Sequence, residues 1–194
     1  KEGSKVTLAD LDIVNTYFRS REVRETLMGE GIRVISDTLN SVKGLDMPYL
    51  SPAIKGAIVF NEGSLVIDCG GDNVGVRVLK QYEEEIKAQD YRMYMTVNIY
   101  RPETDSTEKI MVMKDSLEKE SGLTVCGYIN NSNFLRETTV EDIVKADTIL
   151  KTVSAKTDIP IKYTSAIKDV IVKLPEEISG ERLILNLSLR SQWM

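Results

Sequence analysis

The sequence contains no histidine and only two cysteines, Cys69 and Cys126. The absence of histidine excludes histidine-dependent catalytic triads, histidine-ligated zinc and imidazole general bases. Because the cysteines lie far apart and form no C-x-x-C pair, neither a zinc site nor a disulfide framework is indicated, and we interpret each as a small apolar filler. Any catalysis must therefore use carboxylates, lysine, arginine, amides or a bound ion.

Long hydrophobic runs and an excess of positive charge are also missing. No apolar run approaches the roughly 20 residues that a membrane-spanning helix requires, and the first residues do not resemble a signal peptide, so we expect a cytoplasmic protein. The formal net charge is −5 and the pI is near 5.0, which argues against a dedicated nucleic-acid binder, although a local basic patch is compatible with it. A chain of 194 residues, 42% of them hydrophobic, fits one globular domain, residues 1–194.

Short β-branched runs alternate with longer amphipathic segments along the chain. The runs predict strands at residues 6–9, 32–35, 65–67, 93–97, 124–129 and 161–163. Apolar residues at helical spacing predict helices at residues 74–86, 110–117 and 140–153. This alternation predicts an α/β fold with a mostly parallel sheet and helices on both faces.

Local signals refine this prediction. Asp105 with Glu108, and Thr138 with Glu141, each give a helix N-cap candidate with an acid three positions later. Residues 36–61 contain two prolines and two glycines, and we expect an irregular excursion there.

Three predicted strands end in polar residues. These ends are Asp10-Leu-Asp12, Asp68-Cys-Gly70-Gly71-Asp72 and Asn130-Asn131-Ser132-Asn133. In a parallel sheet all three lie at the same edge, where ligands bind. Acids beside a phosphate imply a cation between them, most simply Mg²⁺ that retains several waters, and glycines allow backbone N–H groups to approach the phosphate.

Each of these residues also has a purely structural interpretation. Asp10 or Asp68 alone could cap a helix or form an Asx turn. Asp72 or Asn73 is favoured as the cap of the helix predicted from about Val74. The asparagine cluster is typical of a turn. The combination of all three sites favours the functional interpretation.

In this order, the motifs resemble those of the MinD/ParA-like group of P-loop ATPases. The matching segments are Asp10-Leu-Asp12, Leu65-Val-Ile-Asp68-Cys-Gly-Gly71 and Gly127-Tyr-Ile-Asn-Asn131. The resemblance covers nearly the whole chain and implies a P-loop NTPase-like fold, an ATP-binding switch that hydrolyses ATP with Mg²⁺, and by analogy a homodimer with ATP between its subunits.

The resemblance also implies roles for individual residues. Asp10 and Asp68 would hold Mg²⁺ through water, and Asp12 would position the attacking water. Two further roles would fall to residues that contact the nucleotide. The amides of Gly70 and Gly71 would sense the γ-phosphate, and the Asn131 side chain, or that of Asn130 if the register differs by one, would bind adenine.

The chain departs from this family in one respect, because none of its 12 glycines is followed by lysine and the G-x-x-x-x-G-K-[ST] loop is absent. Residues 1–5 resemble the end of a helix that leads into the first strand. Our hypothesis is that roughly 25 to 30 residues with a strand, the P-loop and a helix precede Lys1, so that these residues alone are not expected to be active. The alternative is a true loss, giving a degenerate, non-catalytic nucleotide-binding or protein-interaction module.

The position of the P-loop strand gives a structural criterion. Because that strand is central in the family, we expect the strands from Val6 and Leu65 to flank a gap or a further strand. Direct pairing would favour a true loss.

Two other segments suggest partners. Arg19, Arg21 and Arg24 could dock an acidic protein, or they could belong to a solvated helix start with local ion pairs. Trp193 and Met194 end the chain, but Arg190 is the only basic residue beyond Arg182, which does not support a basic membrane-binding helix. A Rossmann-type enzyme is disfavoured because no G-x-G-x-x-G follows any predicted strand.

Overall fold

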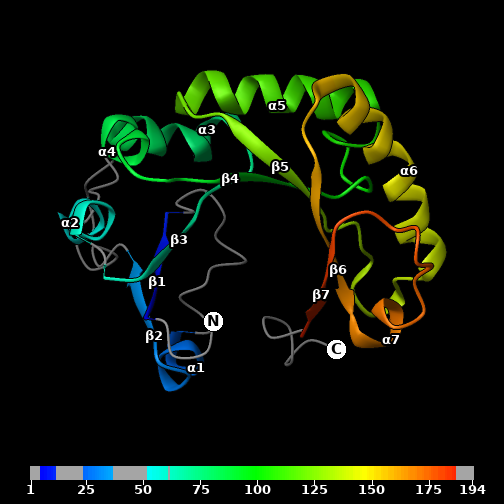
Figure 1. The fold of residues 1–194 in the computed structure, drawn as a ribbon, viewed down its shortest axis with the longest axis horizontal. Coiled ribbons are helices and arrows are strands. Elements are labelled where there is room, and N and C mark those ends of the chain that lie inside the picture. Colours follow the sequence, from blue (N-terminus) through cyan, green and yellow to red (C-terminus); the bar gives the residue numbers. More distant parts are fainter. Residues whose placement is uncertain (1–4, 12–23, 37–51, 61, 187–194) are drawn as a thin grey trace, which may run out of the picture. The chain divides into compact units, whose positions relative to one another are not determined.

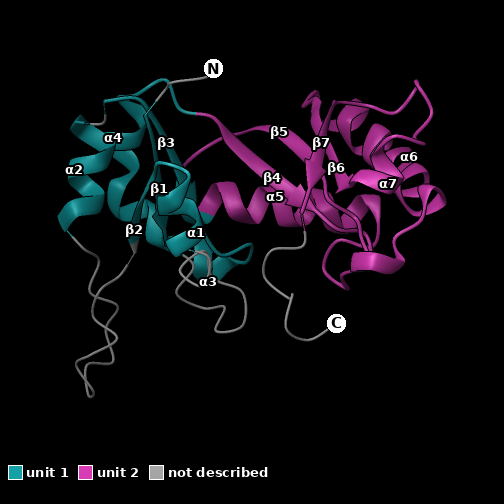
Figure 2. Cartoon of the chain, turned by 90° about the horizontal axis from the view of Figure 1, so that it is seen from below, with its two compact units in different colours: residues 1–91, 120–122 teal, residues 92–119, 123–194 magenta. Residues whose placement is uncertain are grey.

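The computed structural model describes residues 5–11, 24–36, 52–60 and 62–186. Its chain groups into two compact units, coloured separately in Figure 2. The first comprises Lys1–Tyr91 and Glu120–Gly122, and the second comprises Arg92–Lys119 and Leu123–Met194. The α/β class with parallel strands is confirmed, but the described strands form two sheets instead of one. The expectations of one domain, of helices on both faces and of a P-loop NTPase-like fold stay predictions.

The first unit contains a three-stranded parallel sheet with the order β2-β1-β3. Its strands are β1 (Val6–Asp10), β2 (Ile32–Ser36) and β3 (Ser64–Asp68). The central strand carries the most buried residues, with Ala9 fully buried and Thr7 5% exposed on the same face. The position of β1 between two neighbours explains why its apolar residues are covered more completely than those of β3, where Val66 is 51% exposed.

Short helices surround this sheet. They are α1 (Arg24–Gly29), α2 (Pro52–Phe60), α3 (Asn73–Val76) and α4 (Glu83–Lys87), with the 3-10 helix η2 (Arg77–Tyr82) between the last two. The helix α1 packs on β2, and α2 packs on α4. Residues 52–60 are helical, so the expectation of an irregular segment is wrong there; Pro52 occupies the first helical position, where its missing N–H costs nothing.

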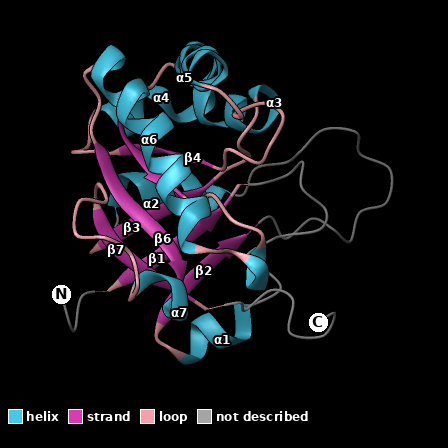
Figure 3. Cartoon of the chain, turned by 90° about the vertical axis from the view of Figure 1, so that its right-hand side faces the viewer, coloured by secondary structure: helices cyan, strands magenta, loops and turns pink. Residues whose placement is uncertain are grey.

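The second unit contains a four-stranded parallel sheet whose strands follow the chain order (Figure 1). The strands are β4 (Met93–Val97), β5 (Val125–Asn130), β6 (Ile161–Ile167) and β7 (Glu181–Leu185). Helices join them, as the colouring by secondary structure in Figure 3 shows, and two of these, α5 and α6, are longer than any helix described in the first unit. They are α5 (Thr107–Ser121), α6 (Val140–Thr157) and α7 (Lys168–Ile171), with the 3-10 helix η3 (Leu135–Glu137) before α6.

The helix α6 buries one regular stripe against this sheet. Four of its residues, Ile143, Ala146, Leu150 and Val153, are fully buried at spacings of three and four, as the sequence pattern predicts. The helix packs on β5 and β6, and Ile143 shares a core cluster with Ala166 of β6 and with residues of α7. This stripe fixes which face of β5 and β6 is covered.

The two predicted helix caps lie one residue too early in the sequence. The cap of α6 is Thr139, whose hydroxyl accepts a hydrogen bond from the Asp142 amide while the Asp142 carboxylate accepts one from the Thr139 amide. Thr138 is not the cap because its hydroxyl accepts from the Phe134 amide and donates to the Leu135 carbonyl. At α5, the Ser106 hydroxyl rather than Asp105 accepts from the Lys109 amide.

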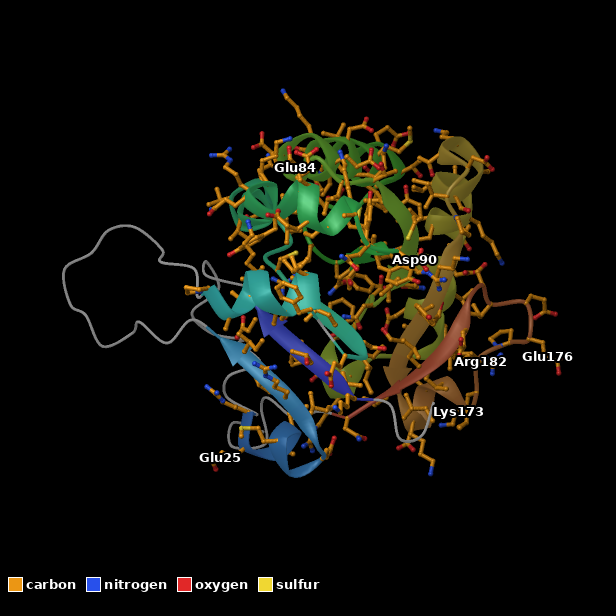
Figure 4. The ribbon with its side chains drawn as sticks, turned by 60° about the vertical axis from the view of Figure 1, so that its left-hand side comes forward. Glu25, Glu84, Asp90, Lys173, Glu176 and Arg182 are labelled. Carbon is orange, nitrogen blue, oxygen red and sulfur yellow. The ribbon has the colours of Figure 1, made fainter. Side chains whose placement is uncertain are left out.

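The last strand, β7, is held by polar contacts with the preceding turn. Arg182, labelled in Figure 4, donates to the carbonyl oxygens of Ile171, Leu174 and Pro175, which lie at the end of α7 and just beyond it. The buried Asp147 carboxylate accepts from the Ser179 amide at 3.1 Å. These contacts fix the connection between α7 and β7.

Within the described ranges, no helix is long and apolar enough to cross a membrane.

Candidate functional site

The carboxyl ends of β1 and β3 bring two of the predicted site residues together. Asp10 and Asp68 are register partners on adjacent parallel strands, so their side chains leave the same face of the sheet. Asp10 is 4% exposed, whereas Asp68 is exposed. The prediction that these two carboxylates share one sheet edge is confirmed. The third polar strand end belongs to β5, in the second sheet, so the expectation that all three strand ends lie at the edge of one sheet is wrong.

The expectation of a gap or a further strand between these two strands is wrong. All five residues of β1 pair in register with β3. Hydrogen bonds extend the ladder at both ends, from the Ser64 amide to the Lys5 carbonyl at 3.0 Å and from the Leu11 amide to the Asp68 carbonyl at 2.7 Å. Such a complete ladder leaves no room between the strands. The other edge of β3 has no strand partner within the described part of the chain.

The turn after β3 is shaped by its glycines. Gly70 is buried, and a Cβ atom on Gly75 would lie 2.5 Å from the Gly70 Cα atom, so the start of α3 packs directly on the turn. Gly71 is exposed, and nothing lies within 4 Å of the position of a Cβ atom there. Of the two glycines proposed to sense phosphate, Gly71 is therefore the one with an accessible backbone.

Asp72 has the structural role that the sequence favours. Its Oδ1 atom accepts hydrogen bonds from the Val74 amide at 3.0 Å and the Gly75 amide at 2.7 Å. These bonds satisfy two amides at the start of α3 that would otherwise lack acceptors. Asp72 is thus the N-cap of α3.

The arrangement of acids limits the kind of metal site that is possible. Among the described residues, no group of three or more Cys, Asp or Glu side chains could hold a metal ion. Asp12 lies outside the described residues. Mg²⁺ is usually bound through one or two carboxylates, with waters and substrate phosphates as its other ligands. Asp10 and Asp68 fit such a phosphate-bound ion and do not fit a site made of protein ligands alone.

At the carboxyl end of β5, the two candidate asparagines have different environments. Asn130 is fully buried; its Nδ2 donates to the Ile143 carbonyl at 3.3 Å, and its Oδ1 accepts from the Ser132 amide at 3.3 Å. Asn131 is partly exposed, and its Oδ1 accepts from the Ser165 hydroxyl at 2.9 Å. Asn130 is therefore enclosed by the protein and not placed to contact a ligand, whereas part of Asn131 is exposed.

The loop after Asn131 is strained and carries an exposed aromatic ring. The Asn133 Oδ1 atom accepts from the Leu135 amide at 3.2 Å, an Asx-type contact that agrees with the turn expected from the asparagine cluster. Leu135 has φ of 59°, in the left-handed region that a leucine rarely adopts. Phe134 is 48% exposed, and its ring centroid lies 4.1 Å from that of Tyr100.

Tyr100 and Asp142 join the loop after β4 to the start of α6. The Tyr100 hydroxyl donates to Asp142 Oδ1 at 2.5 Å. Burial and this hydrogen bond raise the pKa of Tyr100 to about 12. Burial alone would raise the pKa of Asp142, but hydrogen bonds from Tyr100 and Thr139 outweigh it and lower this pKa. Sequence reasoning missed Tyr100 and Ser165, because neither belongs to a motif.

The arginines proposed to bind an acidic partner are described only in part. Arg24 begins α1, and its guanidinium donates to the Val34 carbonyl at 3.3 Å, within the first unit. Arg19 and Arg21, like Trp193 and Met194, lie outside the described residues. The proposed acidic partner stays a prediction.

Comparison with known proteins identifies no relative of this chain. No protein-family model, no curated protein and no solved structure matches the chain. The function of the protein is therefore inferred from its residues and their arrangement.

Proposed function

We propose that the protein binds ATP with Mg²⁺ and uses its hydrolysis as a switch, in the manner of the MinD/ParA-like ATPases. One observation carries the proposal. Asp10 and Asp68 are register partners at the ends of adjacent parallel strands, and an exposed glycine, Gly71, lies three residues after Asp68. In parallel α/β sheets this edge is where ligands bind. As parts of the same proposal, the ATP-bound protein pairs with a second copy and acts in the cytoplasm.

The side chains at this edge would divide the chemistry between them. Asp10 and Asp68 would hold the waters of the ion, which when bound neutralises charge on the phosphate oxygens. Asp12 would orient the attacking water. The Gly71 amide would donate a hydrogen bond to the γ-phosphate. Hydrolysis would remove the γ-phosphate and so release the turn. Because no Cβ hinders Gly71, that turn is free to approach a phosphate closely.

This proposal requires a P-loop lysine, which these 194 residues do not supply. A P-loop strand cannot lie between β1 and β3, because they pair directly. The opposite edge of β3 remains available, since β1 is its sole strand partner in the described ranges. An added parallel strand there would place its own carboxyl end beside Asp68.

A second candidate function is a non-catalytic module that binds nucleotide or protein and has lost the P-loop. The direct pairing of β1 with β3 favours this alternative, because a P-loop strand is expected between these two strands in the MinD/ParA-like family. The two candidates differ in one measurable property, because only the switch turns over ATP.

The test measures binding and hydrolysis on the full-length protein. We expect Mg²⁺-dependent ATP binding by calorimetry and ATP turnover that Asp68→Asn lowers by about 10²-fold or more, while the Kd for ATP changes by less than about tenfold. The matched control is Asp90→Asn, because Asp90 is exposed and lies before β4 (Figure 4).

The outcomes separate the candidates. Equal losses of binding and turnover in Asp68→Asn would indicate a folding defect rather than loss of an ion-holding group. Binding without turnover in the unaltered protein would contradict the switch and support the non-catalytic module. If the protein binds no nucleotide, the proposed nucleotide site itself is wrong.

A further inference from the structure

Three of the four polar groups of Asn131 are already hydrogen-bonded within the protein. Its backbone amide donates to the Val97 carbonyl at 2.8 Å, and its carbonyl accepts from Asn133 Nδ2 at 2.7 Å. Its Oδ1 accepts from the Ser165 hydroxyl at 2.9 Å. The side-chain Nδ2 is the remaining group, and it has no acceptor among the described residues. Because Asn131 is partly exposed, this NH₂ group is available to a ligand.

Ser165 is placed to determine the orientation of the Asn131 amide. Asn130 of β5 pairs in register with Thr164 of β6, so the next residues, Asn131 and Ser165, lie side by side on the other face. Ser165 is 3% exposed, and its hydroxyl has two nearby acceptors, Asn131 Oδ1 at 2.9 Å and the Asn130 carbonyl at 3.2 Å. A hydroxyl has one proton, and the shorter distance favours Asn131.

We infer that Ser165 is a positioning residue that makes Asn131 a hydrogen-bond donor toward its ligand. With Oδ1 turned toward a buried hydroxyl that occupies one of its two acceptor positions, Asn131 presents its N–H groups to the ligand. This inference rests on the proposed function, in which the ligand is an adenine nucleotide. Asn131 would then bind a ring nitrogen of the base, N1 or N7, because the 6-amino group of adenine is itself a donor.

The polarity of this contact determines what the site can discriminate. N1 of adenine is an acceptor, but N1 of guanine carries a proton, so a contact to N1 selects adenine. N7 is an acceptor in both bases, so a contact to N7 does not discriminate. The 6-amino group would contribute little in either case, since the Asn131 oxygen is turned toward Ser165.

The test uses nucleotide analogues with the full-length protein. Calorimetry would compare ATP with purine riboside triphosphate, which lacks the 6-amino group, and with 1-deaza-ATP and 7-deaza-ATP, which each lack one ring nitrogen. We expect removal of the 6-amino group to change Kd by less than about threefold, and removal of one ring nitrogen to raise Kd about tenfold. In Ser165→Ala the freed amide can turn, so this tenfold penalty should fall below about threefold.

Two variants control for structural effects. Thr164→Val removes the hydroxyl of a fully buried neighbour on β6, which donates to the Ser179 carbonyl at 2.8 Å and not to Asn131. This variant should keep the ring-nitrogen penalty even if it loses stability. Ser165→Thr keeps the hydroxyl and should restore the penalty that Ser165→Ala loses.

A measurement without nucleotide tests the orientation directly. If Ser165 holds Oδ1, the two side-chain amide protons of Asn131 have no acceptor in the part of the chain that the structure describes, and NMR should show both in rapid exchange with water. Protection of one proton in the unaltered protein, absent from Ser165→Ala, would show that Nδ2 donates to Ser165 and would overturn the inference.

The analogue series has its own contrary outcomes. A penalty for the missing 6-amino group with none for either ring nitrogen would mean that Asn131 faces the base with its oxygen. An unchanged ring-nitrogen penalty in Ser165→Ala would mean that Ser165 does not position Asn131. In both cases ATP still binds, so the proposed function would stand. If the unaltered protein binds no nucleotide, the proposed function and the adenine contact fall together, while the NMR result still decides how Ser165 orients Asn131.

Discussion

The carboxyl ends of the two sheets differ in the chemistry that they present. At the ends of β1 and β3 there are two carboxylates, one of them exposed, beside a turn with an accessible glycine. At the end of β5 there are amides and hydroxyls that mostly satisfy one another. Charged groups gathered at one edge repel each other unless a cation lies between them, whereas neutral polar groups can saturate internally. The first end is therefore suited to an ion, and the second to a neutral polar contact.

The local structure behind the two ends differs as well. The turn after β3 leads into a helix of four residues that packs on Gly70 through Gly75. The loop after β5 leads into the 18-residue helix α6, which has a capping box and a tyrosine contact at its first turn. The local structure at the carboxyl end of β3 therefore depends on close backbone packing, and that at the carboxyl end of β5 depends on hydrogen bonds.

The largest expected effect concerns Asp12, which we propose acts at the first end. If Asp12 orients the attacking water, Asp12→Ala should keep ATP and Mg²⁺ bound but slow single-turnover hydrolysis by about 10²-fold or more. ATP would then persist, and size-exclusion chromatography with ATP should show a larger dimer fraction. If Asp12 only caps a turn, the melting temperature would fall by a few degrees for about 1 kcal/mol, with hydrolysis per folded molecule unchanged.

The second prediction tests the close backbone packing at the first end. Gly75→Ala should lower the free energy of unfolding by about 1 to 3 kcal/mol, because the new Cβ atom would lie 2.5 Å from the Gly70 Cα atom. Gly56→Ala in α2 is the control, since nothing lies within 4 Å of that Cβ position and alanine is the better helix former. Urea unfolding measures both; a similar change in both variants would contradict the packing argument.

The third prediction addresses the neutral contact at the second end. Asn131→Ala should reduce the preference for ATP over GTP by up to about tenfold, because a hydrogen bond to the base edge is lost. Competition binding on the full-length protein measures this ratio. A parallel weakening of both nucleotides, with no change in their ratio, would exclude a contact to N1 and leave N7 as its partner. Unchanged binding of both nucleotides would remove Asn131 from base recognition.

A smaller effect is expected from the cap of α6. Thr139→Ala should lower the free energy of unfolding by about 1 kcal/mol, because the Asp142 amide loses its acceptor. Thr148→Ala in the same helix is the matched control, as the Thr148 hydroxyl is exposed and donates only to the Val144 carbonyl one turn earlier. Thermal unfolding of the two variants should differ; equal melting temperatures would show that the cap contributes little.

The smallest effect should come from the pH dependence of Tyr100. Its pKa is raised from about 10 in the unfolded chain to about 12 in the folded protein. The associated stability is thus fully present below pH 10 and is lost as pH rises toward 12. Tyr100→Phe should reduce the loss of stability across this window, measured by urea unfolding at several pH values. An identical pH profile for the variant would contradict the raised pKa.

The sequence by itself determined the positions of the strands and the chemistry at their ends. Each of the six predicted strands overlaps an observed one, because a short run of β-branched residues is a local feature of the sequence. The sharing of one edge by Asp10 and Asp68 also followed, since the strands of a parallel sheet all end at the same edge. The cap formed by Asp72 could be predicted because its partners are two and three residues away.

Only the tertiary structure decided which neighbours these residues meet. Asn130 is the last residue of β5 and Asn131 follows it, and the packing of α6 determines that Asn130 is the buried one. The contact of Asn131 with Ser165 spans 34 positions, and the direct pairing of β1 with β3 spans more than 50. Local periodicity specifies the face from which a side chain leaves the backbone. The residue that it meets there depends on how distant segments pair in space.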